Sequence, residues 1–344
     1  MGFLSGITKR LLSMRIISKQ LAAYFAVLLF VLLLNFWLPR LLPGGPVEFI
    51  AGGEDSAIFM SEAHKEALLA YYRLDDSIWQ QFMTYVKGLF ALDFGMSFSF
   101  KAPVTEVIAA RLPWTLLIVG LSTLLSIVIG LTIGLVSAWK HPGRVDRGSF
   151  VGMLTISAVP EFLLGMLMLL LFSVEWNWFP LGGAETPFLR PEHLWDRIAD
   201  IARHAFLPVM TLTIANLASL YLLMRNEASR VRGEPYIEFA LAKGISESRV
   251  LFHHAARNAA LPLFTIIVMR IGGLVAGSVL AETVFAYPGI GRLLQEAIHA
   301  RDYPLLHGLF LLMTIAVLCL NALADGLYPY LDPRIRQGRK RGAA

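Results

Sequence analysis

Long apolar stretches alternate with polar, charged segments along the chain. A helix needs about 20 mostly apolar residues to cross the hydrocarbon core of a bilayer. Such stretches occupy residues 21–38, 114–136, 150–174, 206–224, 261–281 and 305–324. We therefore predict an all-α integral membrane protein with about six transmembrane helices. The first stretch lacks a small-residue cleavage site nearby, so it is expected to remain as an anchor rather than be removed as a signal peptide.

Basic residues indicate how these helices are oriented. They cluster before the first stretch, between the second and third, between the fourth and fifth, and after the sixth. With six spans, all four clusters fall on one side, and positively charged loops are typically cytoplasmic. The prediction is a cytoplasmic N-terminal segment (1–20), a first transmembrane helix (21–38), a long external segment (39–113) and a core with five further helices (114–331). A cytoplasmic loop (225–260) lies within that core, and a basic cytoplasmic tail (332–344) follows it.

The composition supports lipid as the main solvent. Hydrophobic residues make up 56% of the 344 residues and charged residues only 16%, whereas soluble domains average about 25% charged residues. The net charge of +5 could indicate a nucleic-acid partner. Because the basic residues lie beside apolar stretches, we assign them to membrane orientation and expect no nucleic-acid partner. The lone Cys319 excludes a disulfide framework within one chain.

The segment from Tyr236 to Pro262 is too polar to span a membrane and too apolar to be a flexible linker. Tyr236, Phe239, Ala240 and Lys243 are spaced to lie on one face of a helix. Gly244 can adopt the left-handed conformation that ends a helix.

A second helix is expected directly after this glycine. Ser246 is a suitable N-cap, and Ile245 and Val250 are spaced for a hydrophobic staple across the helix start. This helix runs through His254 and Asn258 to the fifth apolar stretch. The pattern predicts a rigid helix–glycine–helix lever fused to a transmembrane helix.

The lever resembles the "EAA" coupling motif of bacterial ABC importer permeases, through Glu238, Ala240 and Gly244. Phe239 stands where the generic motif has alanine, and Leu261-Pro262 comes later than its Leu-Pro. Both departures are typical of the subgroup that imports peptides, nickel and related solutes. The residues that match the subgroup's loop are Tyr236, Ala240, Ala242, Lys243, Gly244, His254, Arg257, Asn258, Ala259, Leu261 and Pro262.

Further segments resemble this subgroup in the same order along most of the chain. They are LLPGGPV (41–47), RLPWTL (111–116), VPEFLLG (159–165), ETVFAYPGIGRLL (282–294), ARDYPLLHG (300–308) and LDPRIR (331–336). One difference is Arg73, which stands at a glycine position of the subgroup. The shared order, together with the long first external segment, indicates a B-type permease subunit.

The resemblance implies a type I ABC importer fold in the bacterial inner membrane and a pathway for dipeptides, oligopeptides or a related small solute. The implied partners are a second homologous permease subunit, two ATP-binding subunits and an extracytoplasmic solute-binding protein. ATP and magnesium would bind the ATPase subunits, with no cofactor or catalytic residue in this chain. The ATPase subunits would contact the lever, whose implied coupling residues are Tyr236, Glu238, Phe239, Ala240, Lys243, Gly244, His254 and Asn258.

Three ionisable residues lie within or beside apolar stretches, where charge is costly and usually functional. They are Glu161, Arg270 and Glu282. Arg270 either lines the translocation pathway or pairs internally, for example with Glu161. Glu161 and Glu282 match the subgroup's pattern and are expected to serve packing and gating.

Motifs for other chemistry are absent from the sequence. It has no GxxxxGK[ST] phosphate loop, no HExxH zinc motif and no GxSxG nucleophile motif. A secondary transporter remains an alternative, although the inverted repeats typical of that class are not visible. An intramembrane hydrolase using Ser278 with His307 is a weaker one.

Overall fold

The computed structural model describes residues 22, 24–41, 66–67, 70, 75–91, 93–189 and 192–331. For residues 38–39, 261–262, 265–266, 268–277 and 324–331 it describes the backbone alone. The predicted N-terminal segment 1–20 and tail 332–344 lie outside these residues. The chain forms two compact units. Unit 1 comprises Met1–Ala109 and Leu294–Leu318, and unit 2 comprises Ala110–Leu293 and Cys319–Ala344.

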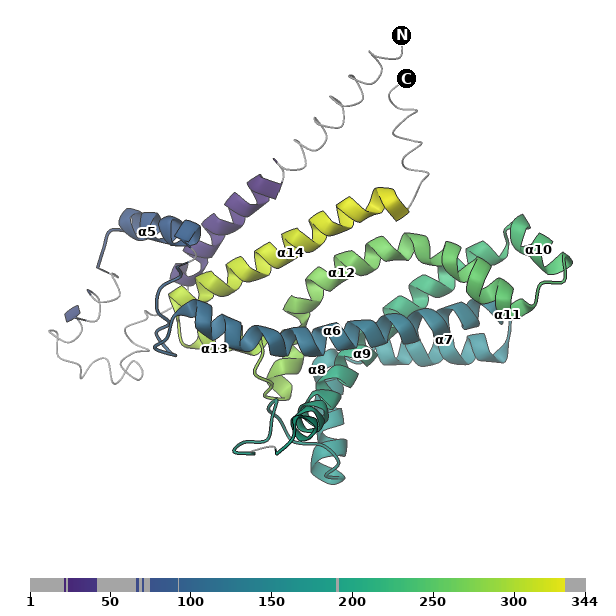
Figure 1. Cartoon of the computed structure of the whole chain (residues 1–344), viewed down its shortest axis with the longest axis horizontal. Coiled ribbons are helices and arrows are strands. Elements are labelled where there is room, and N and C mark those ends of the chain that lie inside the picture. The colour runs from purple at the N-terminus through teal and green to yellow at the C-terminus, as the bar shows by residue number, and fades with distance from the viewer. Residues whose placement is uncertain are drawn as a thin grey trace, which may run out of the picture. The chain divides into compact units, whose positions relative to one another are not determined.

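Helices make up the regular structure of the described residues, apart from one isolated β-bridge between Met96 and Pro103 (Figure 1). Tyr24–Trp37 is followed by the 3₁₀ turn η1 (Leu38–Leu41), α5 (Ile78–Ala91), α6 (Val104–Trp139), α7 (Arg144–Ser157), α8 (Glu161–Leu169) and the π-helical turn η2 (Leu170–Glu175). Then come α9 (Leu194–Arg232), α10 (Pro235–Ala242), α11 (Glu247–Arg249), the π-helical turn η3 (Val250–Ala255), α12 (Ala256–Val284), α13 (Ile290–His299) and α14 (Tyr303–Leu331).

Three described helices are long and apolar enough to cross a membrane: α6, α9 and residues Tyr303–Leu323 of α14. A fourth candidate is the pair formed by α7 and α8 with η2. The predicted stretches 21–38 and 261–281 also coincide with helices, Tyr24–Trp37 and α12. The structure is thus mainly helical with three or four candidate spans among the described residues.

The third predicted span differs from the structure, because residues 150–174 do not form one straight helix. The chain bends by 93° between α7 and the helix that starts at Glu161. Pro160 lies at this break with φ −57° and ψ 140° and precedes the first residue of α8. Proline has no backbone N–H and disfavours helical conformation at the preceding residue, so it ends α7 and starts α8 instead of continuing one helix.

Helix α9 lies at the centre of unit 2, packed against α7, α8 and α12. Glycines of α6 allow its backbone to approach α9 closely. A Cβ atom at Gly134 would lie 2.6 Å from the carbonyl oxygen of Tyr221, and one at Gly130 would lie 3.0 Å from Cβ of Leu220. Small residues at helix contacts are typical of membrane proteins, where close van der Waals packing drives association.

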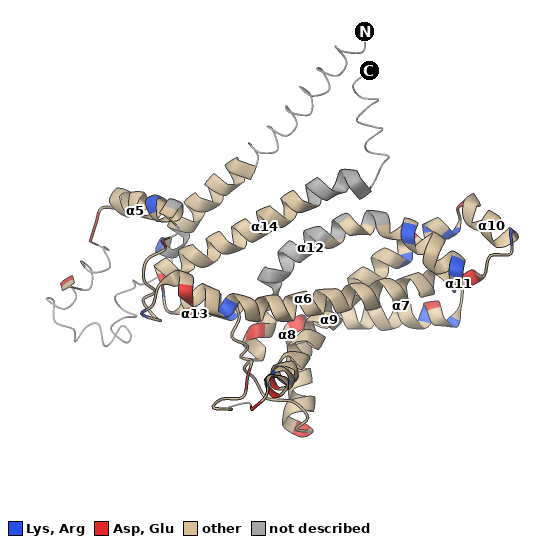
Figure 2. Cartoon of the chain, viewed as in Figure 1, with Lys and Arg blue, Asp and Glu red and all other residues tan. Residues whose placement is uncertain are grey.

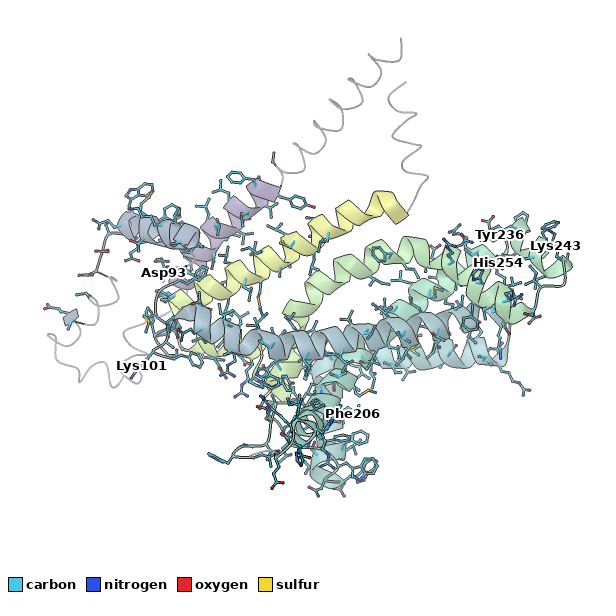
Figure 3. The ribbon with its side chains drawn as sticks, in the orientation of Figure 1. Asp93, Lys101, Phe206, Tyr236, Lys243 and His254 are labelled. Atoms are coloured by element: carbon cyan, nitrogen blue, oxygen red, sulfur yellow. The ribbon has the colours of Figure 1, made fainter. Side chains whose placement is uncertain are left out.

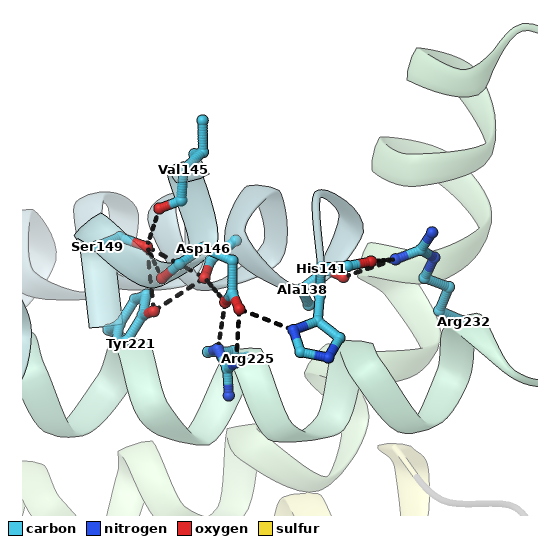
Figure 4. Close-up of polar contacts among 9 residues, drawn as sticks. Ala138, His141, Val145, Asp146, Ser149, Tyr221, Arg225 and Arg232 are labelled. Carbon is cyan, nitrogen blue, oxygen red and sulfur yellow. Dashed lines mark hydrogen bonds and ion pairs between the residues drawn. The ribbon is translucent and has the colours of Figure 1, made fainter. Parts of the chain in front are cut away.

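A buried polar network joins α7 to α9 at one end of unit 2 (Figure 4). The Asp146 carboxylate accepts hydrogen bonds from Arg225 Nε at 2.6 Å and Nη2 at 2.9 Å. It also accepts one from Ser137 Oγ at 2.6 Å, and its Oδ2 lies 2.8 Å from His141 Nδ1. Asp146 is only 5% exposed. Since an unpaired buried charge is costly, this bidentate pair holds α7 and α9 in register.

Candidate functional site

Helix α10 forms the first arm of the lever at the end of unit 2 where Lys and Arg gather (Figure 2). Proline at its first turn suits the helix start, because the missing N–H has no intrahelical partner there. Ile237 and Ala240 are buried, at 1% and 7% exposure. Tyr236 and Phe239 point outward, at 41% and 62% exposure. The helix therefore keeps one face in the protein core and presents aromatic rings on the other.

Ala240 differs from the predicted arrangement, in which it shared one face with Tyr236, Phe239 and Lys243. The structure buries Ala240 beside the core, while the Lys243 ammonium lies 4.4 Å from the centroid of the Phe239 ring. The four predicted residues cover about a third of the helix circumference. Ala240 lies at one edge of this face, and that edge is turned toward the core. Of the predicted coupling residues on α10, Tyr236, Glu238 and Phe239 are exposed.

The turn after α10 depends on Gly244. Its φ is +78°, in the left-handed region that favours glycine. The amide of Gly244 donates to the Leu241 carbonyl at 2.9 Å, and that of Ile245 donates to the Ala240 carbonyl at 3.3 Å. These bonds satisfy carbonyls at the helix end, as C-terminal glycine caps do. The predicted helix stop at Gly244 is confirmed.

The second arm of the lever begins after Ser246, which occupies the N-cap position of α11 as predicted. From Glu247 the chain remains helical through α11, η3 and α12 to Val284. The Asn258 amide donates to the His254 carbonyl at 2.8 Å on this arm. The second arm of the lever and the fifth apolar stretch are therefore parts of one continuous helical run (Figure 3).

A hydrophobic cluster anchors the lever to α6, α9 and α12. Burying one large aliphatic side chain fully stabilises a protein by about 1.5–3 kcal/mol, and several lever residues are buried in this cluster. Its buried members are Leu135, Ala138, Met224, Ala228, Val231, Ile237, Ala240, Val250, Leu251, Ala255, Ala259 and Leu263. Beside this cluster, Arg232 ties the end of α9 to the end of α6, because its Nη1 donates to the carbonyls of Ala138 at 3.2 Å and His141 at 2.6 Å (Figure 4). The lever is thus braced on three helices.

The outer side of the lever exposes large apolar side chains beside charged ones. Tyr236, Phe239, Leu241 and Phe252 are 41%, 62%, 38% and 56% exposed. In Figure 3 the labelled Tyr236, Lys243 and His254 mark this end of the unit. Clustered exposed apolar side chains with a polar surround are typical of protein interaction sites.

Glu282 organises the turn that joins α12 to α13. Its carboxylate is fully buried and accepts hydrogen bonds from Thr115 Oγ1 at 2.7 Å, Ser278 Oγ at 3.1 Å and the Arg292 amide at 3.0 Å. A Cβ atom at Gly289 would lie 2.3 Å from the carboxyl carbon, so glycine lets the turn pass over it. Sequence reasoning singled out Glu282 but missed Thr115, whose hydroxyl also accepts from the Ile290 amide at 2.7 Å.

Of the other two ionisable candidates, the structure describes Glu161 fully and Arg270 by its backbone alone. Glu161 is the first residue of α8, and its Oε1 has no hydrogen-bond partner among the described residues. Arg270 belongs to α12, but its side chain lies outside the described part. A pair between them stays a prediction. No group of three or more His, Cys, Asp or Glu residues suited to a metal ion occurs within the described residues.

The comparisons with known proteins identify the family. Residues 130–337 match the family described as binding-protein-dependent transport system inner membrane component. The chain belongs to this family. The matched part of this inner membrane component contains the whole lever and the Glu282 turn, which agrees with the resemblance seen in the sequence.

Full-length relatives support the same assignment of this inner membrane component. It is 36% identical to the oligopeptide transport system permease protein AppB of Bacillus subtilis over 315 residues, covering 90% of this chain and 95% of that protein. It is 33% identical to the dipeptide transport system permease protein DppB of Escherichia coli over 339 residues, covering 94% and 99%. The similarity therefore extends beyond residues 130–337 into the N-terminal part of the chain.

Proposed function

We propose that this inner membrane component forms the translocation pathway of an ATP-driven peptide importer together with a second homologous permease subunit. A solute-binding protein delivers the peptide from outside, and two ATPase subunits drive transport. The relatives named as oligopeptide and dipeptide permeases support the choice of substrate class. In this arrangement the chain crosses the membrane six times with both termini in the cytoplasm, in agreement with its basic loops.

The lever carries the coupling role in this proposal. Its aromatic outer face, with Tyr236, Phe239 and Phe252 exposed, is the surface that an ATPase subunit would cover. Glu238, Lys243, His254 and Asn258 surround or support that face, and Gly244 sets the angle between the two arms. Because α11, η3 and α12 are one helical run, movement of the lever displaces the transmembrane helix directly.

The same importer proposal gives roles to the three ionisable residues in or beside the apolar stretches. In this proposal Arg270 serves the translocation pathway, where it would meet a peptide carboxylate or pair with Glu161. Charged groups at membrane depth usually face such an interior rather than lipid. Glu282 acts at the outer end of α12 by holding the turn that closes this helix against α6 and α13.

The decisive experiment compares Gly244→Val with Gly244→Asn in cells that import a radiolabelled dipeptide. No atom lies within 4 Å of a Cβ at this position, so each substitution acts through the backbone. Asparagine tolerates the left-handed conformation, whereas a β-branched residue does not. We expect Gly244→Val to abolish uptake at a normal level of membrane insertion, with Gly244→Asn retaining most of it.

A contact test addresses the partner directly. In a Cys319→Ser background, Phe239→Cys should form a crosslink to an ATPase subunit, whereas cysteine at the buried Ile237 should not. Undiminished peptide uptake in cells that lack every ATPase partner would refute the proposed importer and favour a secondary transporter.

A further inference from the structure

Unit 1 contains a cavity of about 680 Å³ that no role described above uses. Its walls come from η1, the turn before α5, α5 itself, the loop that follows α5 and the start of α14. Sites for small ligands typically measure about 300–1,000 Å³. Four charged residues of balanced sign line the cavity: Arg40, Asp76, Lys87 and Asp93. The labelled Asp93 marks its loop in Figure 3.

Arg40 provides a half-buried cation in this cavity. Its Nη1 donates to the Phe36 carbonyl at 2.6 Å and its Nη2 to Gln81 Oε1 at 2.8 Å. Among the described residues, no carboxylate oxygen lies within ion-pair distance of this guanidinium. Burial lowers the pKa of Arg40 from its ordinary value, which reflects the cost of holding this charge away from water. An anionic ligand would relieve that cost.

Two further polar groups lie beside Arg40 around the ring of Phe36. The His307 side chain is 9% exposed, lines the cavity, and its Nε2 has no hydrogen-bond partner among the described residues. The Tyr85 hydroxyl accepts from Asn35 Nδ2 at 3.2 Å, which leaves its own proton to donate. Burial raises the pKa of Tyr85 to about 12, so the hydroxyl keeps this proton at neutral pH.

All three groups lie near the same aromatic ring, that of Phe36. The Arg40 guanidinium lies 3.7 Å from the Phe36 ring centroid, and the rings of Tyr85 and His307 lie 5.8 Å and 6.3 Å from it. The Tyr85 and His307 ring centroids are 4.7 Å apart. A guanidinium with spare N–H donors and a phenol with a spare proton suit a carboxylate, which only accepts hydrogen bonds. The acidic residues on the same walls suit an ammonium group.

We propose that this cavity binds a small zwitterion with a free carboxylate, which Arg40 and Tyr85 bind beside His307 while Asp93 faces its ammonium group. A short peptide or a free amino acid has this chemistry. The preference for a peptide rests on the proposed function. In the predicted topology the cavity lies on the external side, since Arg40 directly follows the first apolar stretch. The site would hold substrate on the permease itself, apart from the binding protein.

The test is equilibrium binding of radiolabelled dialanine to the purified full importer complex in lipid nanodiscs, without nucleotide and without binding protein. We expect saturable binding that unlabelled dialanine displaces and its C-terminal amide does not. Arg40→Gln should weaken binding by about tenfold or more, the loss expected for a hydrogen bond to a charged group. His307→Phe, which keeps a ring in the aromatic cluster, should also weaken it.

The control is Lys101→Gln, which removes an exposed cation of unit 1 that does not line the cavity. It should bind dialanine as the wild type does. Displacement by free alanine at similar concentration would support the zwitterion site and assign it to amino acids as well. Equal binding of the amide, or wild-type affinity in both Arg40→Gln and His307→Phe, would overturn the proposal.

Uptake in cells separates this inference from the proposed function. Cells that import labelled dipeptide while the purified complex shows no Arg40-dependent binding would refute the cavity site alone. Cells that import no peptide in the presence of all partner subunits would refute the peptide importer, whatever the cavity binds.

Discussion

Replacing Glu282 with alanine should strongly destabilise the permease, because this carboxylate holds together three parts of unit 2. It is fully buried and bonded to α6 through Thr115, to α12 through Ser278, and to the first turn of α13 through the Arg292 amide. The two hydroxyl groups can turn toward other acceptors once the carboxylate is gone. The Arg292 amide lies in the first turn of α13 and has no such freedom.

The expected loss follows from these contacts. A buried donor left without an acceptor costs about 1–3 kcal/mol, and each hydrogen bond to a charged group contributes about 1.5–3 kcal/mol. Because the hydroxyls recover part of their bonding, we expect Glu282→Ala to lower the free energy of unfolding by about 3–5 kcal/mol. Glu282→Gln, which keeps the volume and one acceptor oxygen, should cost about 1–2 kcal/mol. Thr115→Ser keeps the hydroxyl and serves as the matched control.

The assay is unfolding of the purified protein in detergent, followed by circular dichroism as the fraction of sodium dodecyl sulfate rises. The midpoint should fall most for Glu282→Ala, less for Glu282→Gln, and little for Thr115→Ser. A midpoint for Glu282→Ala equal to that of the wild type would refute the reasoning. So would an equal loss in Thr115→Ser, since that change leaves the bonding groups in place.

Three other changes test separate contacts in the same unfolding assay. Asp146→Ala leaves the partly buried Arg225 without its partner and should cost about 1.5–3 kcal/mol; an unchanged midpoint would show that the pair carries no net stability. Gly134→Ala places a methyl group 2.6 Å from a backbone oxygen of α9 and should cost about 1–3 kcal/mol, whereas Gly120→Ala, with open space around it, should be neutral or stabilising. Asp302→Ala removes a buried acceptor for the Leu305 amide, the Ser99 amide and the Ser97 hydroxyl and should cost about 2–4 kcal/mol; equal stability would exclude a structural role of this carboxylate.

Much of the fold could be predicted because a long apolar stretch is visible in the local sequence and favours a membrane helix. Five of the six predicted apolar stretches each coincide with a single described helix, and Gly244 and Ser246 mark the helix stop and start that their chemistry favours. The third stretch was predicted as one span, but it breaks at Pro160. The bend of 93° depends on how α8 packs against α9 and α12, which no single position encodes.

Contacts between distant segments could not be predicted in the same way. Asp146 and Arg225 are 79 positions apart, and Thr115 and Glu282 are 167 apart. Each residue alone fits an ordinary helix end, and one sequence does not reveal which helices lie side by side. The cavity near Arg40 was missed for the same reason, since its walls come from segments more than 200 residues apart.

The π-helical turn η3 (Val250–Ala255) sets the rotational phase between the lever and α12. Such a turn is equivalent to one extra residue in an α-helix, and each residue advances the helix by about 100°. Deleting a residue here would therefore rotate the exposed aromatic side chains of the lever by about 100° relative to α12 and displace the buried Val250 and Leu251 from their hydrophobic cluster.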